Sequence, residues 1–318
     1  MKKNIAVALG ALALLAGAGA AGASCGTAFC VLNTNWSTQG VASDPGTLRL
    51  DLRYEFIDQT HLQQGTKRIS TDDAAGEEKT ELRTLNRNWL TTLDYTFSKN
   101  WAVSVSAPVV DRSHSHIDNA TGGTEKWDFT KIGDTRVLGF YRFDNEDNPT
   151  VNYGLSFGIK LPTGSYRFSN SDGVFAERSL QPGTGSTDTV LGGYYSAPGL
   201  HQDSSWFAQV LYQKAVSIKD EFTPGKQFQL NLGYRYPLTH ELQALLQLNT
   251  SIKDRDSGAN AEPDLSGSRA AFLSPGLSYA FTDDFQLYGF VQLPVYRNYN
   301  GVQLAVDWAF VAGATLRF

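Results

Sequence analysis

The sequence predicts an all-β protein: a transmembrane, antiparallel, up-and-down β-barrel of 12 strands. Three observations predict this fold class. Most of the chain consists of segments in which apolar and polar side chains alternate with a period of two, because successive residues of a strand point to opposite faces. The connections between these segments include short turns and long loops in alternation, as in outer-membrane barrels. The final segment, 302–318, alternates in the same way and ends on an aromatic residue, Phe318.

Bulk properties are compatible with a barrel and argue against other classes. The chain has 318 residues and a formal net charge of −5, so it has no basic footprint for nucleic acid. No internal stretch approaches the ~20 consecutive apolar residues of a membrane-spanning helix. The mean hydropathy of −0.28 does not argue against a membrane protein, because half of each barrel strand faces a polar lumen.

The amino terminus has the parts of a secretory signal peptide. Lys2 and Lys3 precede an apolar run over 5–16, and small residues follow it. We therefore expect residues 1–23 to be cleaved and the mature chain to be exported to the bacterial outer membrane.

Cys25 and Cys30 are the only cysteines in the sequence. In an exported protein such a pair predicts a disulfide, which here closes a small loop. The segment that contains them, 24–46, has no sustained period but includes apolar residues. We expect it either to lie in the periplasm or to plug the lumen. Two thiols alone make a poor zinc site, so they do not predict a metal.

The first predicted strand, 47–58, shows two distinct faces. Its even-numbered residues from Leu48 to Phe56 are apolar, and they alternate with a charged row: Arg49, Asp51, Arg53 and Glu55. A soluble sandwich would not easily bury both rows, whereas lipid on one side and a polar lumen on the other accommodate them. The same alternation, bounded by turn residues, gives 12 strands in chain order: 47–58, 80–97, 101–110, 131–143, 150–161, 187–195, 205–218, 226–236, 241–252, 269–281, 285–296 and 302–318. Residues 47–318 are thus predicted to form the barrel.

The connections fall into two groups. Short connections rich in turn residues follow even-numbered strands, as at 98–100, 144–149, 237–240 and 282–284. Long connections follow strands one, three, five and nine: 59–79, 111–130, 162–186 and 253–267. Outer-membrane barrels have short periplasmic turns, so both termini are predicted to be periplasmic. Aromatic residues near the short turns predict an interfacial girdle: Phe97, Trp101, Tyr141, Phe143, Tyr153, Tyr236, Phe281, Phe285 and Phe318.

Four blocks go beyond a general barrel pattern. They are 101–112 (WAVSVSAPVVDR), 158–164 (GIKLPTG), 181–188 (QPGTGSTD) and 292–297 (QLPVYR). In this order and spacing, the chain resembles the outer-membrane transporter family named after the meta-pathway of phenol degradation. The resemblance covers most of the mature chain and implies an outer-membrane barrel thought to pass or bind small, often aromatic, compounds. It implies no catalytic residue.

The polar face of the strands supplies the candidate residues of a solute path. Its charged candidates are Arg49, Asp51, Arg53, Asp94, Arg136, Lys160, Arg235 and Asp307, and its aromatic candidates are Phe140, Phe272, Tyr288, Phe290 and Tyr296. Two interpretations of the charges stay open: a polar constriction that selects solutes, or an ion-paired filling of a narrow barrel. The aromatic side chains could guide an apolar solute or only fill space.

His114 and His116 lie where the third predicted strand meets its loop, and a period of two places both imidazoles on one side. They are candidates for a transition-metal site, with Asp118, which has the same parity, as a third ligand. A solvated pair at the rim is the alternative, and no cofactor is predicted.

Together these observations predict a channel or facilitator for passive passage of small molecules, including aromatic or hydrophobic ones. The alternative is an adhesin or structural barrel that works through its extracellular loops. An enzyme is not expected, because no histidine falls mid-strand beside a serine on the lipid face. The expected partners are outer-membrane lipid, small-molecule solutes and, through the C-terminal strand, the barrel-assembly machinery. The protein is expected to be a monomer.

Overall fold

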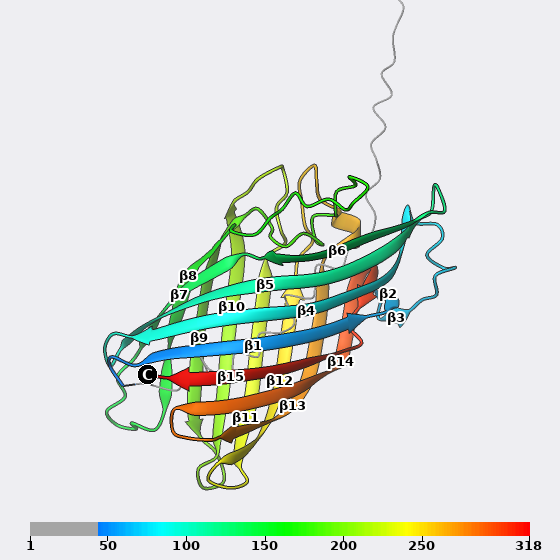
Figure 1. The fold of residues 1–318 in the computed structure, drawn as a ribbon. Coiled ribbons are helices and arrows are strands. Elements are labelled where there is room, and N and C mark those ends of the chain that lie inside the picture. Colours follow the sequence, from blue (N-terminus) through cyan, green and yellow to red (C-terminus); the bar gives the residue numbers. More distant parts are fainter. Residues whose placement is uncertain (1–43) are drawn as a thin grey trace, which may run out of the picture.

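The computed structural model describes residues 44–318, and the structural statements below concern these residues. Twelve strands form a closed antiparallel barrel (Figure 1). They are β1 (Leu48–Gln59), β4 (Lys79–Thr96), β5 (Trp101–Asp118), β7 (Thr135–Arg142), β8 (Asn152–Leu161), β9 (Thr187–Pro198), β10 (Ser205–Ser217), β11 (Gln227–Pro237), β12 (Leu242–Lys253), β13 (Ser268–Ala280), β14 (Phe285–Ala305) and β15 (Trp308–Arg317). The predicted fold class is confirmed.

The predictions for the amino terminus are not tested. The signal peptide 1–23, the disulfide between Cys25 and Cys30 and nearly all of the segment 24–46 lie outside the described residues. In the part of the chain that is described, no helix is long and apolar enough to cross a membrane. The short 3₁₀ helix η2 (Pro263–Leu265) lies in the loop between β12 and β13.

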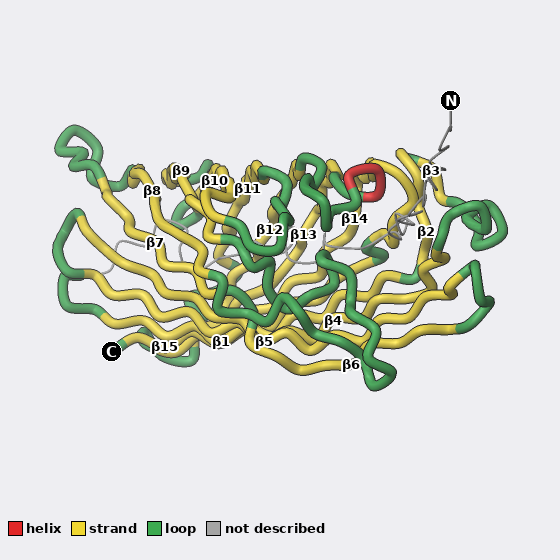
Figure 2. Tube along the Cα trace, turned by 90° about the horizontal axis from the view of Figure 1, so that it is seen from above, coloured by secondary structure: helices red, strands yellow, loops and turns green. Residues whose placement is uncertain are grey.

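The barrel closes because its last strand pairs with its first. β15 lies antiparallel to β1 from Arg317 opposite Arg49 to Trp308 opposite Asp58, and it pairs with β14 on its other side. Pairing of β13 with β14 completes the ring, so the 12 strands leave no open edge. Figure 2 shows β15, β1, β4 and β5 as one wall and β8 to β13 as the opposite wall.

The two faces of the strands differ as the alternation predicts. Polar residues that point inward are buried, whereas outward apolar side chains are exposed, such as Trp89 (55%), Leu155 (50%) and Leu277 (52%). An exposed apolar band of this kind is what a hydrocarbon environment stabilises. The aromatic residues near the short turns also contact one another: the rings of Trp101 and Tyr141 lie 4.9 Å apart, and those of Phe143 and Tyr153 lie 5.4 Å apart.

The two ends of the barrel are distinct, and we name them for their connections. The short-turn rim contains the start of β1, Phe318 and the turns 97–100, 143–151, 199–204, 238–241 and 281–284. The long-loop rim contains the connections 60–78, 119–134, 162–186, 218–226, 254–267 and 306–307.

Two predicted loops contain strands instead. β5 continues to Asp118 and forms a hairpin with β6 (Thr124–Ile132), so the predicted loop 111–130 is wrong. The reason is that side-chain alternation persists there, with His114, His116 and Trp127 all buried. The predicted loop 59–79 likewise contains β2 (His61–Gly65) and β3 (Lys67–Arg68), and β2 pairs with the far end of β14.

Two strand boundaries also differ from prediction. β14 extends to Ala305, so residues 302–305 belong to it and the closing strand begins only at Trp308. Residues 131–132 end β6, and β7 starts at Thr135, because the register against β5 shifts at Gly133 and Asp134: Ile132 lies opposite Val109, but Arg136 lies opposite Ser106. Asp134, at this break between β6 and β7, lines the lumen cavity described below.

Candidate functional site

A cavity of about 200 Å³ lies in the lumen beneath the loop 162–186. Inward residues of β1, β4, β5, β7, β8, β10, β11 and β12 surround it, and the loop supplies its roof from Arg178 to Thr184. Its wall is mixed. Leu138, Phe140 and Leu211 are apolar, whereas the facing strands contribute glutamines: Gln209, Gln213, Gln227 and Gln229.

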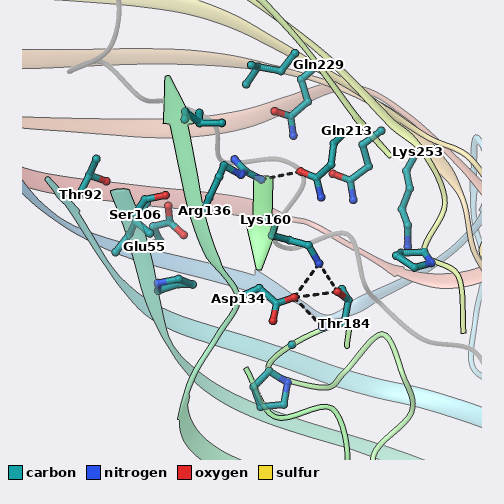
Figure 3. A pocket seen from close by; sticks show the side chains of 18 of the residues that line it. Glu55, Thr92, Ser106, Asp134, Arg136, Lys160, Thr184, Gln213, Gln229 and Lys253 are labelled. Atoms are coloured by element: carbon teal, nitrogen blue, oxygen red, sulfur yellow. Dashed lines mark hydrogen bonds and ion pairs between the residues drawn. The ribbon is translucent and has the colours of Figure 1, made fainter. Parts of the chain in front are cut away.

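Lys160 is the centre of the polar wall (Figure 3). Its Nζ lies 2.9 Å from Asp134 Oδ2, 3.3 Å from Asp188 Oδ2 and 3.2 Å from Ser186 Oγ, and it also donates to Thr184 Oγ1. The side chain of Lys160 is only 7% exposed, and a buried ammonium of this kind requires such partners. The predicted lumen residue is therefore ion-paired rather than free.

Asp134 connects this cluster to the roof. Its Oδ1 accepts a hydrogen bond from Gly164 N (3.1 Å), and its Oδ2 accepts from Thr184 N and Thr184 Oγ1 (2.9 Å each). One carboxylate thus holds both ends of the loop 162–186. Thr163 adds a further link, because its Oγ1 donates to Gly133 O at 2.8 Å.

Three glycines allow these segments to meet. A Cβ on Gly183 would lie 2.5 Å from Asp134 Oδ1 and 2.7 Å from Gly164 O, and a Cβ on Gly164 would lie 2.9 Å from the Gly133 carbonyl carbon. Real Cβ atoms essentially never come so close, so the approach of the backbones requires glycine at these positions.

The β5–β6 hairpin forms a platform for the roof loop. Trp127 packs with Ala176 and Leu180, and its Nε1 donates to Val174 O at 3.1 Å. Arg112 Nη1 donates to Leu180 O at 2.8 Å. The roof is therefore fixed at its ends by Asp134 and along its length by the hairpin.

Arg136 continues the polar wall toward β10. Its Nη2 donates to Gln213 Oε1 at 2.9 Å, and Gln213 Nε2 donates to Asp188 Oδ2 at 2.6 Å. Two cations, Lys160 and Arg136, thus share one network with two carboxylates, Asp134 and Asp188. The cluster is formally neutral.

Four ionisable groups meet at the long-loop rim. Lys79 Nζ lies 3.2 Å from Glu177 Oε1, and Glu81 and Glu262 lie within electrostatic reach of the pair. Burial raises the pKa of Glu262 to about 8 and raises the pKa of Glu177 well above its ordinary range. Glu177 belongs to the loop 162–186 and Glu262 to the loop 254–267. These loops therefore pack together most favourably when both carboxyl groups are protonated.

The predicted charges on β1 are paired with one another or with their neighbours. Arg49 contacts Asp94 at 2.9 Å, and Arg53 contacts Glu55 at 2.8 Å. Asp51 accepts hydrogen bonds from Tyr288 Oη (3.0 Å) and Thr315 Oγ1 (2.9 Å). On this wall the geometry corresponds to an ion-paired filling.

The predicted aromatic residues separate into two places. Phe272, Tyr288 and Phe290 join an inward apolar cluster with residues of β1, β12 and β15, whereas Phe140 packs with Leu138, Val190 and Leu211 beside the cavity. Tyr296 is not in the lumen, and its prediction is wrong. An irregularity in the β13–β14 register opposite 271–272 gives β14 an extra residue, which reverses the alternation and leaves Tyr296 48% exposed.

Two further predicted residues lie at the ends of the barrel. Asp307, between β14 and β15, accepts hydrogen bonds from Thr60 N (2.9 Å) and Thr60 Oγ1 (2.7 Å) and contacts His61 Nδ1. It therefore fixes the long-loop rim rather than the cavity wall. Arg235 lies at the opposite, short-turn rim.

His114 and His116 are buried and lie in a chain of hydrogen bonds. His114 Nδ1 is 2.7 Å from Thr84 Oγ1, His114 Nε2 is 3.3 Å from His116 Nδ1, and His116 Nε2 is 2.9 Å from Glu125 Oε2. They are not a solvated rim pair, because the β5–β6 hairpin covers them. Within residues 44–318, no group of three or more His, Cys, Asp or Glu side chains is placed to hold a metal ion.

The chain matches a known protein family. Residues 58–301 match the family described as "Putative MetA-pathway of phenol degradation". The chain belongs to this family. A search of curated proteins gives no match.

One solved structure has the same fold. The chain is similar to the COG4313 outer membrane channel from Pseudomonas putida F1, with a TM-score of 0.67 and 14% identity over 88% of this chain and 98% of that chain. It is also similar to a Pseudomonas aeruginosa FadL homologue (TM-score 0.41, 11% identity, 88% and 96% covered) and to the KdgM porin (TM-score 0.44, 11% identity, 85% and 99% covered). At these identities the likeness concerns the fold.

The structure gives a physical role to two of the blocks that suggested the phenol-degradation family. Block 158–164 supplies Lys160 and Gly164, and block 181–188 supplies Gly183, Thr184 and Asp188. Sequence reasoning missed Asp188, Thr184 and Gln213 as members of the site. The first two belong to block 181–188, which the sequence had already distinguished from a general barrel pattern.

Proposed function

We propose that this protein is an outer-membrane channel for passive passage of small molecules, with its short-turn rim in the periplasm. The observation that carries the proposal is the lumen cavity beneath an anchored roof loop. A barrel that served only as a scaffold would gain nothing from a cavity bounded by a neutral network of paired charges. A constriction loop held over a lumen is instead what a size-selective passage requires.

The size and wall of the cavity suggest which solutes fit. A cavity of about 150 Å³ is enough to hold benzene in a protein core, and the cavity here is about 200 Å³. Ligand sites usually combine apolar walls with a few placed polar groups. Phe140, Leu138 and Leu211 provide the apolar side, and the amide of Gln227 can provide hydrogen bonds. Single-ring solutes with one polar substituent match this wall.

The surroundings of the channel follow from its surface. The exposed apolar band would contact outer-membrane lipid, and the closing strand β15 with Phe318 would be read by the barrel-assembly machinery. Closure within one chain makes a monomer sufficient. We also propose that the segment 24–46 restricts the lumen, because its sequence combines a cysteine pair with apolar residues.

Uptake into liposomes tests the proposal. Purified mature protein is reconstituted, and the entry of a panel of single-ring solutes is compared with protein-free liposomes. Faster entry of these solutes than of a disaccharide is expected, because the roof limits size. Deleting residues 24–46 is expected to raise conductance in planar bilayers. Impermeability to the whole panel, with and without the deletion, would refute a channel.

A further inference from the structure

A second cavity opens at the short-turn rim and has a volume of about 790 Å³. Its lining includes two guanidinium groups, on Arg235 of β11 and Arg317 of β15, together with amides from Asn152, Gln243 and Gln286. None of these groups belongs to the neutral network around Lys160. The rim cavity is therefore a separate polar site on the same lumen axis.

The charges at this rim are unbalanced. Among the described residues, Arg49 pairs with Asp94, whereas the side chains of Arg235 and Arg317 form no ion pair or hydrogen bond, and Arg235 Nε is buried without a partner. Arg142, at the end of β7, has the lumen-facing parity of Arg136 and is likewise unpaired within residues 44–318.

Carboxylates near these arginines form no ion pair with them in the described chain. Asp203, which also lines the cavity, attracts Arg235, and Asp284 attracts Arg317, but both carboxylates lie on exposed turns beyond ion-pair distance. Four arginines and one carboxylate, Asp94, thus occupy the inward positions closest to the short-turn rim. The arginines are Arg49, Arg142, Arg235 and Arg317. One cluster at the long-loop rim has the opposite imbalance, since Lys79 lies there with Glu81, Glu177 and Glu262.

Unpaired guanidinium groups in a polar cavity attract anions. Arginine is always protonated, and its planar fork binds carboxylate or phosphate oxygens through two parallel hydrogen bonds. A cavity with low-dielectric walls focuses the field of such charges and raises the local concentration of counter-ions. The amides of Gln243 and Gln286 can donate to oxygen atoms that the arginines leave free.

We propose that the short-turn rim cavity binds the oxyanion group of small organic anions through Arg235 and Arg317 and makes the lumen prefer anions. The preference in passage rests on the proposed channel function, whereas binding to the cavity does not. Two sources of the oxyanion share this chemistry, a carboxylate and a phosphate ester, and the experiment separates them.

Equilibrium binding to the full mature protein in uncharged detergent at low salt provides the test. The ligands are benzoate, phenyl phosphate and neutral benzamide, which share one ring. Both anions are expected to bind at least tenfold more tightly than benzamide, and tighter binding of one of them identifies the preferred source. The double variant R235Q/R317Q is expected to lose about tenfold in anion affinity with benzamide unchanged, since a lost charge-assisted pair contributes about one decade.

Matched variants keep the test decisive. R68Q removes an exposed arginine at the long-loop rim and is expected to leave binding unchanged. R235K/R317K retains both charges but not the fork, so it is expected to bind anions more weakly than the wild type and still better than benzamide. If R235Q/R317Q does not assemble, this lysine variant decides: affinity equal to that of the wild type would overturn bidentate recognition.

The outcomes for binding and passage are distinguishable. Anion binding without uptake would refute the channel and leave the rim site standing. Uptake with no difference between benzoate and benzamide, or unchanged by R235Q/R317Q, would refute the rim site and leave the channel standing. A reversal potential in a salt gradient that reports cation preference would also overturn the proposal.

Discussion

Asp134 is the most informative single position in the lumen, because one carboxylate holds both ends of the roof loop. The substitution D134N preserves the shape of the side chain and removes its charge. In the wild type, Oδ1 accepts from Gly164 N, and Oδ2 accepts from Thr184 and from Lys160. An asparagine amide has one acceptor oxygen and one NH₂ group. In D134N the NH₂ group therefore faces a hydrogen-bond donor in either orientation: Gly164 N on one side, or Thr184 and Lys160 on the other.

The magnitude follows from what remains after the substitution. Breaking a buried ion pair typically costs about 3–5 kcal/mol. Lys160 keeps Asp188 at 3.3 Å, so the loss here is smaller, and we expect about 2–3 kcal/mol for opening of the roof loop. At about 1.4 kcal/mol per decade, this corresponds to a roughly 30- to 150-fold larger population of the open loop.

Limited trypsin digestion measures this population. The side chain of Arg178 is only 14% exposed in the closed loop, so cleavage after it requires opening, and its rate follows the open population when reclosing is fast. We expect D134N to raise that rate by the factor above. D172N is the control, because Asp172 lies exposed in the same loop. Equal cleavage rates for the wild type, D172N and D134N would refute the anchoring role of Asp134.

Three further predictions test other contacts. G183A places a Cβ 2.5 Å from Asp134 Oδ1, so the loop must shift and cleavage after Arg178 is expected to accelerate. Y288F removes the hydroxyl that donates to Asp51 at 3.0 Å and is expected to cost about 1–3 kcal/mol, measured as a lower urea midpoint in detergent. Raising the pH from 5 to 9 is expected to lower that midpoint, because burial raises the pKa of Glu262 to about 8.

The sign of the pH effect follows from linkage. The pKa of Glu262 is higher in the folded state than its ordinary value of 4.5, so the folded state binds the proton more tightly. The stabilisation is complete below about pH 4.5 and is lost as the pH rises through about 8. E262Q should flatten this dependence, and a wild type whose midpoint rose between pH 5 and 9 would contradict it.

G76A is the control for G183A, because nothing lies within 4 Å of a Cβ there.

The twelve strands could be predicted because their signal is local. Within each strand, the alternation of apolar and polar residues shows which side chains point outward and which point into the lumen. The turns between strands can be recognised from their own residues in the same way. The same locality explains the error at Tyr296. The register shift opposite 271–272 depends on how β13 and β14 fit together, and it is not written in either strand alone. An alternating pattern assigns the wrong face to every residue beyond such a point.

The lumen residues show where the limit lies for the site. Alternation identified Lys160, Arg136 and Arg49 as inward, but it could not identify their partners. Lys160 is paired across the interruption at Gly133–Asp134 and with a residue of the next strand, whereas Arg49 is paired with Asp94 on β4. Pairing decides whether a charge fills the barrel or faces a solute, and it is set by contacts far apart in sequence.

Charges are paired at one end of the lumen and unpaired at the other, so the two ends can select solutes by different properties. The network of Lys160, Asp134, Asp188 and Arg136 is neutral and its members are engaged with one another, so it can hold the roof without favouring either sign of solute charge. Selection by size can therefore reside at the roof. The unpaired arginines lie at the other end, beside the larger cavity, and there charge can act before or after a solute meets the constriction. A mutation at one end should then alter one kind of selectivity and spare the other. R235Q/R317Q should change the ratio of anion to neutral passage at constant size limit. G183A, which shifts the roof loop but keeps every charge of the network, should change the size limit at constant charge preference.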